Sequence, residues 1–385
     1  MMTIILIFRE IFVFANLRVN LNKKVMYYFP FKKTGFAMFL CLIVLFAGDA
    51  SEGKVLSSKK AKITPQARLA SYPTATVGTN FLGLEDLGPH SYKPNISEKN
   101  GIVYTCKAGH IDIAHVRKLI DWTAFLTSKT YDNLIKNKAA FTFTTAKPSV
   151  YHASITYPPY WKVLSKQQKE KVARDISIRV AQYLAYTSSI WHEILTWFGY
   201  KSLKVYSDFP SAFSWEDTYS NVFGSHIAVM ALRDSEHEFD KAVSLALARE
   251  LEALGIQPSS VARHAAEQVR GQWFTGDLFF VTINRRNFDI GLNDGSITPS
   301  IVPSLAECKG AQAIKHPVPN LDFLSEYGFS IRVEIKPKEW EKDKILKIVF
   351  PKGGTNRIDP SIHFAPIMDY IKKEAVTKYG YDAVE

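Results

Sequence analysis

The sequence has little cysteine, no long run of one charge, and no apolar stretch that spans a bilayer comfortably. With 3 cysteines in 385 residues, it cannot be a small domain held together by many disulfides. The net charge of +11 is spread along the chain, so we expect no nucleic-acid partner. The positive charge indicates a solvated basic surface or, alternatively, attraction to an anionic envelope surface. A content of 46% hydrophobic residues excludes a disordered chain.

The N-terminal segment is typical of a secretory signal peptide. Gly35–Gly48 is an uncharged apolar run preceded by two lysines, and Gly48-Asp49-Ala50 places small residues where signal peptidase cleaves. Spanning a bilayer takes about 20 residues, so the run is short for a retained anchor, which is the alternative. We therefore expect residues 1–50 to be removed, with Met26 as an alternative start. The mature protein would be periplasmic or secreted, without a transmembrane anchor.

Cysteine usage agrees with export. Cys41 lies inside the apolar run, so cleavage leaves only Cys106 and Cys308. An even pair of cysteines in an oxidising compartment predicts one disulfide, which would close a loop of about 200 residues. The alternative is that Cys106 is a nucleophile, with His110 and His115 near it in the sequence.

Composition and periodicity predict an α+β fold. Residues 51–100 are rich in Ser, Lys, Pro and Gly and indicate an extended leader. Residues 101–385 are expected to form a single α+β domain, with a helical core over 101–275. A β-rich part with a C-terminal helix is expected over 276–385.

Individual elements follow from helical spacing, capping residues and β-like runs. We expect helices over 111–126, 165–198, 214–232, 238–254 and 261–270, and another one after Asp359-Pro360. We expect a hairpin within 139–157 and strands in LFFVTI, NFDIGL, SITPSIV, FSIRVEI and ILKIVF, with Asn293-Asp294-Gly295 as a hairpin turn.

The long helix of residues 165–198 carries the first candidate site. Its second half is apolar nearly all round except for His192 and Glu193, so Glu193 is expected to be buried with a partner. The partner belongs either to a structural network or to an acid/base or metal site. A zinc-peptidase helix reads H-E-x-x-H, but here Thr196 stands in the place of the second histidine. We therefore do not expect an ordinary zinc peptidase, and a divalent metal such as zinc would need ligands from other elements.

The segment GHIDIAHVRK supplies the second candidate. Asp112 and His115 are three residues apart and share a helical face, so the carboxylate can orient the imidazole as a base or a metal ligand. The structural alternative is that Asp112 stabilises a helix N-terminus and that His115 packs in an interface. His115 and Arg117 are the nearest expected partners of Glu193.

The segment SAFSWEDTYSN supplies the third candidate. Ser214 and Asp217 have the spacing of a capping box, which gives Asp217 a structural role. Glu216 has no such role and is a candidate catalytic carboxylate.

Three motifs, YTCKAGHIDIAHVRK, WHEILTWFGY and SAFSWEDTYSN, resemble those of an uncharacterised bacterial envelope family known only as a domain of unknown function. The resemblance runs from about Ile102 to the C-terminal region and brings no established reaction. It implies a set of positions that deserve inspection, without roles. These are Cys106, Asp112, His115, Arg117, His192, Glu193, Ser214, Glu216 and Asp217.

Two hypotheses follow. The first is an exported envelope hydrolase in which His115 and His192 act as metal ligands or base, and Glu193 as general base or third ligand. Asp112 and Glu216 complete its candidate catalytic residues, and its substrate is a small molecule or an envelope component. The second is a non-catalytic envelope binding or scaffolding protein with a buried structural His/Glu network.

Overall fold

The computed structural model describes residues 63–93, 95–201, 209–277 and 281–380. The predicted signal peptide and the first part of the predicted leader lie outside this part of the chain, as does the beginning of the segment LFFVTI. All described residues belong to one compact unit, Ser51–Glu385.

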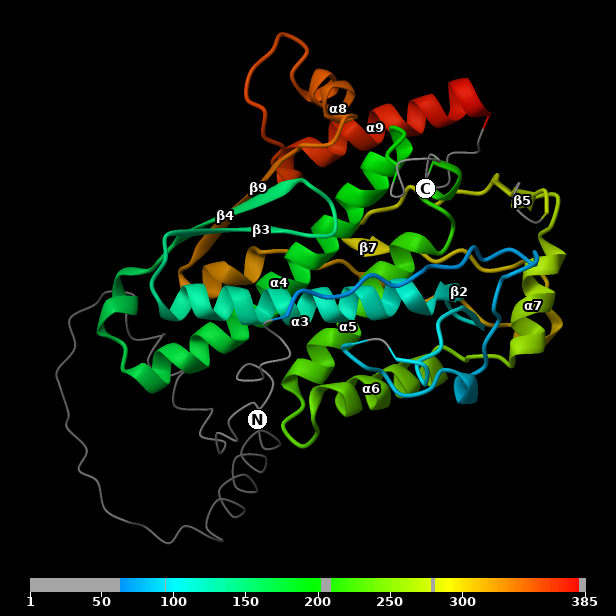
Figure 1. The fold of residues 1–385 in the computed structure, drawn as a ribbon, viewed down its shortest axis with the longest axis horizontal. Helices are drawn as coiled ribbons and strands as arrows, with labels where there is room; N and C mark the ends of the chain where they lie inside the picture. The colour runs from blue at the N-terminus through cyan, green and yellow to red at the C-terminus, as the bar shows by residue number, and fades with distance from the viewer. Residues whose placement is uncertain (1–62, 94, 202–208, 278–280, 381–385) are drawn as a thin grey trace, which may run out of the picture. The chain divides into compact units, whose positions relative to one another are not determined.

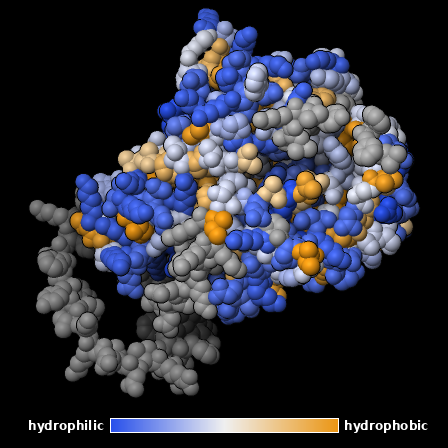
Figure 2. Space-filling model, viewed as in Figure 1, coloured by the Kyte–Doolittle hydropathy of each residue, from blue (hydrophilic) through white to orange (hydrophobic). Residues whose placement is uncertain are grey.

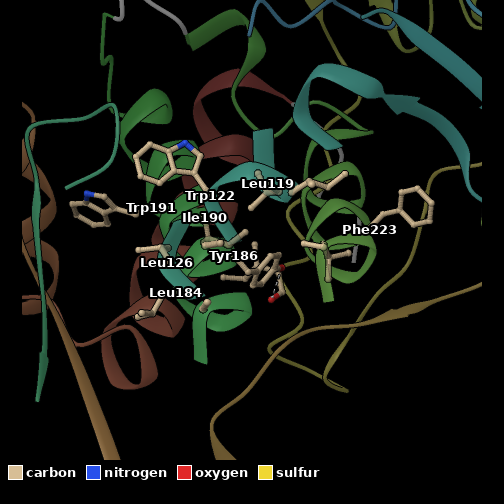
Figure 3. Packing of buried hydrophobic residues seen from close by; sticks show 14 of the residues in the cluster. Leu119, Trp122, Leu126, Leu184, Tyr186, Ile190, Trp191 and Phe223 are labelled. Atoms are coloured by element: carbon tan, nitrogen blue, oxygen red, sulfur yellow. Dashed lines mark hydrogen bonds between the residues drawn. The ribbon is translucent and has the colours of Figure 1, made fainter. Parts of the chain in front are cut away.

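Three helices form the centre of the fold. They are α3 (Ile113–Ile135), α4 (Lys166–Trp197) and α5 (Asp217–Arg233), and α3 packs against both others (Figure 1). The apolar side chains that α3 and α4 turn toward each other fill the core between them, as Leu126 and Ile190 do in Figure 3. The predicted capping box is present at the start of α4, where Ser165 and Gln168 bond to each other's backbone N–H groups.

Gly224 explains how closely α5 approaches α3. A Cβ atom at this position would lie 2.4 Å from the carbonyl oxygen of Val116, so any larger residue would push the two helices apart. This close contact holds the N-terminal parts of α3 and α5 beside each other, which matters for the site described below.

A hairpin precedes α3 and was not anticipated from the sequence. Strand β1 (Ile102–Thr105) pairs antiparallel with β2 (Gly109–Asp112), and the last residue of β2 is also the N-cap of α3. The side chain of Asp112 accepts a hydrogen bond from the N–H of Ala114 at 2.7 Å. The strand therefore delivers Asp112 directly to the helix start.

One three-stranded antiparallel sheet packs beside the helices. Its order is β3 (Ala140–Thr144), β4 (Val150–Thr156) and β9 (Ser330–Lys336). Buried and more exposed residues alternate along β3 and β9, as expected for strands with one face on the core. The predicted hairpin within 139–157 and the strand in FSIRVEI are thus confirmed.

The remaining elements surround this centre. The helices are α6 (Phe239–Ala253), α7 (Ser259–Gln268), α8 (Lys342–Val349) and α9 (Pro360–Tyr379). The short strands are β5 (Phe274–Thr275), β6 (Thr282–Ile283), β7 (Ser296–Ile297) and β8 (His316–Pro317), and the 3-10 turns are Leu84–Asp86, Pro159–Val163, Phe209–Ser211, Ala306–Cys308 and Asp322–Tyr327. Asp359 caps α9 as predicted, and the mixed content confirms an α+β fold.

Several predictions for the C-terminal third were wrong. The segment ILKIVF lies in helix α8, because Ile345 is buried while lysines at helical spacing face water. Short apolar runs of this kind fit a helix or a strand equally well. NFDIGL has no regular structure, and β7 pairs with β8 instead of pairing across the Asn293-Asp294-Gly295 turn.

The predicted leader contributes to the core although it has little regular structure. The guanidinium of Arg68 forms ion pairs with Glu98 and with Asp121 of α3, and all three side chains are buried. The guanidinium of Arg117 lies 3.9 Å from Glu98 and donates to backbone carbonyls of this segment. The expectation that Arg117 would partner Glu193 was therefore wrong, because its side chain turns to the opposite network.

The predicted disulfide is present. Cys106 and Cys308 are joined across a separation of 202 residues with Cα atoms 5.0 Å apart. Because Cys106 is in a disulfide, it has no free thiol. The alternative in which Cys106 is a nucleophile therefore fails. No helix among the described residues is long and apolar enough to span a bilayer.

Candidate functional site

The predicted Asp112–His115 pair forms, and a third residue joins it. Nδ1 of His115 lies 3.3 Å from Oδ2 of Asp112 and 3.2 Å from Oδ1 of Asp217. Asp112 comes from the start of α3 and Asp217 from the start of α5, so the packing of the two helices places both carboxylates on one ring nitrogen. Neither contact has the geometry of a hydrogen bond, and Nδ1 of His115 is buried without a hydrogen-bond partner among the described residues.

The backbone of the leader also reaches this pair. The N–H of Ser71 donates to Oδ2 of Asp112 at 3.2 Å, the same oxygen that faces His115. The hydroxyl of Ser220 on α5 accepts from the N–H of Asp112 at 3.0 Å. Asp112 is thus held by contacts from three segments.

Glu193 faces the same region from α4. Only 3% of Glu193 is exposed, which confirms its predicted burial. Its Oε2 accepts a hydrogen bond from the N–H of Phe213 at 3.0 Å, and the next amide, of Ser214, donates to Oδ2 of Asp217 at the same distance. Phe213 has a φ of +54°, an unusual conformation for a bulky residue, and this conformation points consecutive N–H groups at two carboxylates.

A buried arginine stabilises this turn. The guanidinium of Arg286 donates to the carbonyl oxygen of Ala212, and the N–H of Asn287 donates to the carbonyl oxygen of Phe213 at 2.9 Å. Contacts on both sides of Phe213 therefore compensate for its strained backbone.

Glu216 lies at the start of α5 beside Asp217. The hydroxyl of Ser214 donates to its Oε1 at 2.7 Å, while its Oε2 is buried and has no hydrogen-bond partner among the described residues. The predicted capping box is therefore only half formed. Asp217 accepts from the Ser214 N–H, but the Ser214 hydroxyl bonds to Glu216, and α5 begins at Asp217.

Burial and mutual repulsion control the protonation of these acids. Burial, followed by the charge of Asp217, raises the pKa of Glu193 to about 7. Burial also raises the pKa of Asp217 to about 7, and it raises the pKa of Glu216 well above its ordinary value. Carboxylates that titrate near neutral pH can accept and release protons under ordinary conditions, which is typical of acid/base sites.

Two basic side chains of α3, those of His115 and Lys118, lie near the acids. Burial lowers the pKa of His115 to about 4, with the charge of Lys118 as the next cause, so the imidazole is neutral at pH 7. Lys118, half-buried and one turn along the helix from His115, interacts electrostatically with Glu193, Asp217 and Asp112. Its charge acts to lower the pKa of both Glu193 and Asp217, and the charge of Arg286 does the same for Asp217.

His192 lies beside this cluster but points elsewhere. Its Nδ1 lies 3.4 Å from the hydroxyl of Thr196 on its own helix, and its ring meets the ring of Tyr200. Neighbouring residues leave a helix axis about 100° apart, so His192 and Glu193 cannot face the same point.

The predicted metal ligands His115, His192 and Glu193 are not gathered into a coordination site. Among the residues that the structure describes, no group of three His, Cys, Asp or Glu side chains could hold a metal ion. A common direction fails at His192, because its ring is turned toward Thr196 and Tyr200. His110 is also separate, being buried between the rings of Tyr104 and Trp215.

Comparison with known proteins gives a match to a protein family. The family described as a protein of unknown function, DUF4056, matches residues 66–293. The chain belongs to the DUF4056 family. The match includes all the residues of the site, and it confirms the resemblance to a domain of unknown function. No curated protein and no solved structure matches the chain.

Sequence reasoning missed several residues of this DUF4056 site. Lys118 could have been found, because it is three residues after His115 and shares its helical face. The amide of Phe213, the guanidinium of Arg286 and the amide of Ser71 carry no recognisable sequence signal, because their roles depend on where distant segments meet.

Two cavities of about 530 and 560 Å³ occur elsewhere, one at Tyr186 and Phe364 and the other at Trp197 and Tyr379.

Proposed function

We propose that this DUF4056 protein is an exported hydrolase whose active site contains Asp112, His115, Glu193 and Asp217. The observation that carries the proposal is the placement of one imidazole nitrogen against two buried carboxylates, at 3.3 and 3.2 Å, beside a third acid. A carboxylate that orients a neutral imidazole, next to a group that titrates near pH 7, is a common acid/base arrangement.

In the proposed reaction Glu193 acts as the general base. Its carboxylate accepts a proton from water, the resulting hydroxide attacks the electrophilic centre, and the same proton passes to the leaving group. Asp112 and Asp217 lie beside Nδ1 of His115. The neutral imidazole would hold its proton at Nδ1, facing these carboxylates, and Nε2 would accept a hydrogen bond from the attacking water. Because the pKa of Glu193 is about 7, the rate should rise as pH increases through that value.

A second cluster of buried acids differs from the proposed active site in having a paired arginine, and this difference supports the functional interpretation. Glu98 and Asp121 are paired with the guanidinium of Arg68, and the hydrogen bond from Arg68 helps to lower the pKa of Glu98 despite its burial. That cluster behaves as a structural network. In the proposed active site burial dominates instead and the pKa values are raised, so the fold tolerates acids that it does not fully compensate.

The proposal does not require a metal. A zinc-assisted version was expected from His115, His192 and Glu193, but those side chains do not form a ligand group in the described residues. Acid/base chemistry by the residues themselves is therefore the version that the geometry favours. Adding a chelator to the assay below tests the metal-assisted version directly.

The test is hydrolysis of a panel of chromogenic carboxylic esters, phosphoesters, glycosides and peptides. Glu193→Gln and His115→Gln should lower the rate on any accepted class by about 100-fold or more. Glu170→Gln, on the same helix but half-exposed, should leave the rate unchanged. Equal rates in Glu193→Gln and wild type would refute the proposed role, and loss of activity with EDTA would restore the metal-assisted version.

Export is proposed from the apolar run and the small residues that follow it, which lie outside the described residues. N-terminal sequencing of the accumulated protein should begin at about Ser51. A mature chain that retains residues 36–47 would contradict export with cleavage. The substrate would then be a small molecule or an envelope component that reaches the periplasm or the exterior.

A further inference from the structure

The turn before α8 presents a tryptophan to solvent. The side chain of Trp340 is 95% exposed, whereas Trp161, Trp191 and Trp215 are fully buried. Exposing a large aromatic ring to water is unfavourable, and Trp is enriched where one end of a side chain meets an apolar phase and the other meets water. We therefore expect Trp340 to contact a partner that offers an apolar phase next to water.

The residue before Trp340 fixes its orientation. Glu339 is buried, and its carboxylate accepts hydrogen bonds from the N–H and the hydroxyl of Ser149 at 2.9 and 2.6 Å. The hydroxyl of Ser149 also accepts from the indole N–H of Trp191 at 3.0 Å. Because residue 339 is anchored to the core in this way, the adjacent Trp340 is held outward on a fixed turn.

Positive charge surrounds this tryptophan. Residues 336–357 contain seven Lys and Arg and three Asp and Glu, and one of those acids, Glu339, is buried. Helix α8 buries Ile345 against the core and turns lysines outward. Figure 2, drawn from the same side as Figure 1, shows this region covered mainly by hydrophilic residues. We define the α8 surface by its exposed tryptophan and lysines, which are Lys338, Trp340, Lys344, Lys347 and Lys352; the exposed Asp343 lies among them.

We propose that the α8 surface binds the headgroup layer of an anionic phospholipid bilayer. Lysine ammonium groups attract phosphate, and their alkyl stems can lie along the apolar boundary. The indole of Trp340 would enter the interface, with its N–H toward the headgroups. A soluble polyanion would use the lysines equally well but would provide no apolar layer for the indole, so Trp340 favours the bilayer. The proposal is independent of the proposed hydrolase activity.

The test is co-sedimentation of the natively processed protein with vesicles at 0.1 M salt. One set contains equal phosphatidylglycerol and phosphatidylcholine, and the other contains phosphatidylcholine alone. Wild type should bind the anionic vesicles, and binding should be lost at 1 M salt. Each lysine removed should lower partitioning about fivefold, so the triple variant Lys338→Gln, Lys347→Gln, Lys352→Gln should lose about 100-fold.

Matched controls separate this surface from general charge and hydrophobicity. Trp340→Ala should weaken vesicle binding several-fold, while Val163→Ala, which trims another side chain that is 81% exposed, should not. The triple variant Lys136→Gln, Lys138→Gln, Lys166→Gln removes equal charge from other exposed positions and should bind as wild type.

Three results would overturn the proposal. The first is no preference of wild type for anionic vesicles, and the second is equal loss in the two triple variants. The third is full vesicle binding by Trp340→Ala together with equal binding of dextran sulfate by wild type and that variant, which would indicate a surface for polyanions. Thermal melts of every variant confirm that the fold is intact.

Discussion

Glu193 is a buried acid with one hydrogen bond from Phe213 and a like charge, Asp217, close to it. Removing a carboxylate from water is costly unless strong partners replace the water. The Phe213 N–H and the charge of Lys118 offset only part of that cost, because the pKa of Glu193 stays above its ordinary value of 4.5. At the scale of one residue, the fold accepts a destabilising acid at the proposed active site.

Glu193→Gln should therefore stabilise the protein at high pH. The unfolded chain loses this proton near pH 4.5 and the folded chain near pH 7, so wild-type stability falls as pH rises between those values. Glutamine keeps an acceptor for the Phe213 N–H and removes the charge. The variant should be about 1–3 kcal/mol more stable than wild type at pH 8 and show no such gain at pH 4. Urea unfolding at both pH values measures this, and a loss of stability at pH 8 would indicate a structural role instead.

At the scale of elements, the contact between α3 and α5 builds the site. His115 and Asp217 meet because Gly224 lets α5 lie against the backbone of α3 at Val116. Asn221, on the same helical face between Asp217 and Gly224, is fully buried, and its amide has no partner among the described residues. Orphaned polar atoms of this kind occur where water or a ligand completes the hydrogen bonding.

Gly224→Ala tests the importance of this helix contact. Alanine favours a helix by about 1 kcal/mol over glycine, but its Cβ would lie 2.4 Å from the Val116 carbonyl oxygen. The clash should prevail and lower the free energy of unfolding by about 1–3 kcal/mol. Separating α5 from α3 should also reduce hydrolysis on any accepted substrate. A variant as stable and active as wild type would show that the helices can adjust without affecting the site.

At the scale of the whole molecule, distant parts of the chain are tied to the centre. The segment before residue 100 is held by the Arg68 network, and the C-terminal third is held by the Cys106–Cys308 bond. The disulfide and the Arg68 network both lie near elements that form the site, since Cys106 follows β1 and Asp121 belongs to α3. The site therefore depends on segments well outside its own motifs.

Replacing both cysteines with alanine measures how much the Cys106–Cys308 disulfide contributes to the free energy of unfolding. The bond closes a loop of 202 residues, and restricting the unfolded chain to that extent is worth about 5 kcal/mol in the chain-entropy model. The double variant should lose about 3–5 kcal/mol of unfolding free energy. Chemical denaturation of the variant and of reduced wild type should agree. Two alkylatable thiols in native exported protein would contradict the pairing.

Features that depend on neighbouring residues could be predicted from the sequence. Helical spacing and Ser165 located α4, alternation located the β3–β4 hairpin, and the single charged residue in an apolar helix half predicted the burial of Glu193. The two cysteines outside the predicted signal peptide predicted one disulfide. Each of these signals lies within one segment or follows from composition, so no knowledge of packing was needed.

Which of these residues contact one another depends on how distant segments pack and could not be predicted from the sequence. Asp217 joins His115 and Asp112, Arg117 turns to the network of Arg68, and His192 points away from Glu193. Likewise, only packing decided that ILKIVF forms a helix, since its apolar pattern fits either structure. These outcomes depend on helix crossing and on backbone turns such as Phe213, which join residues far apart in the chain. A periodic pattern records which face of an element is buried but not which element covers it.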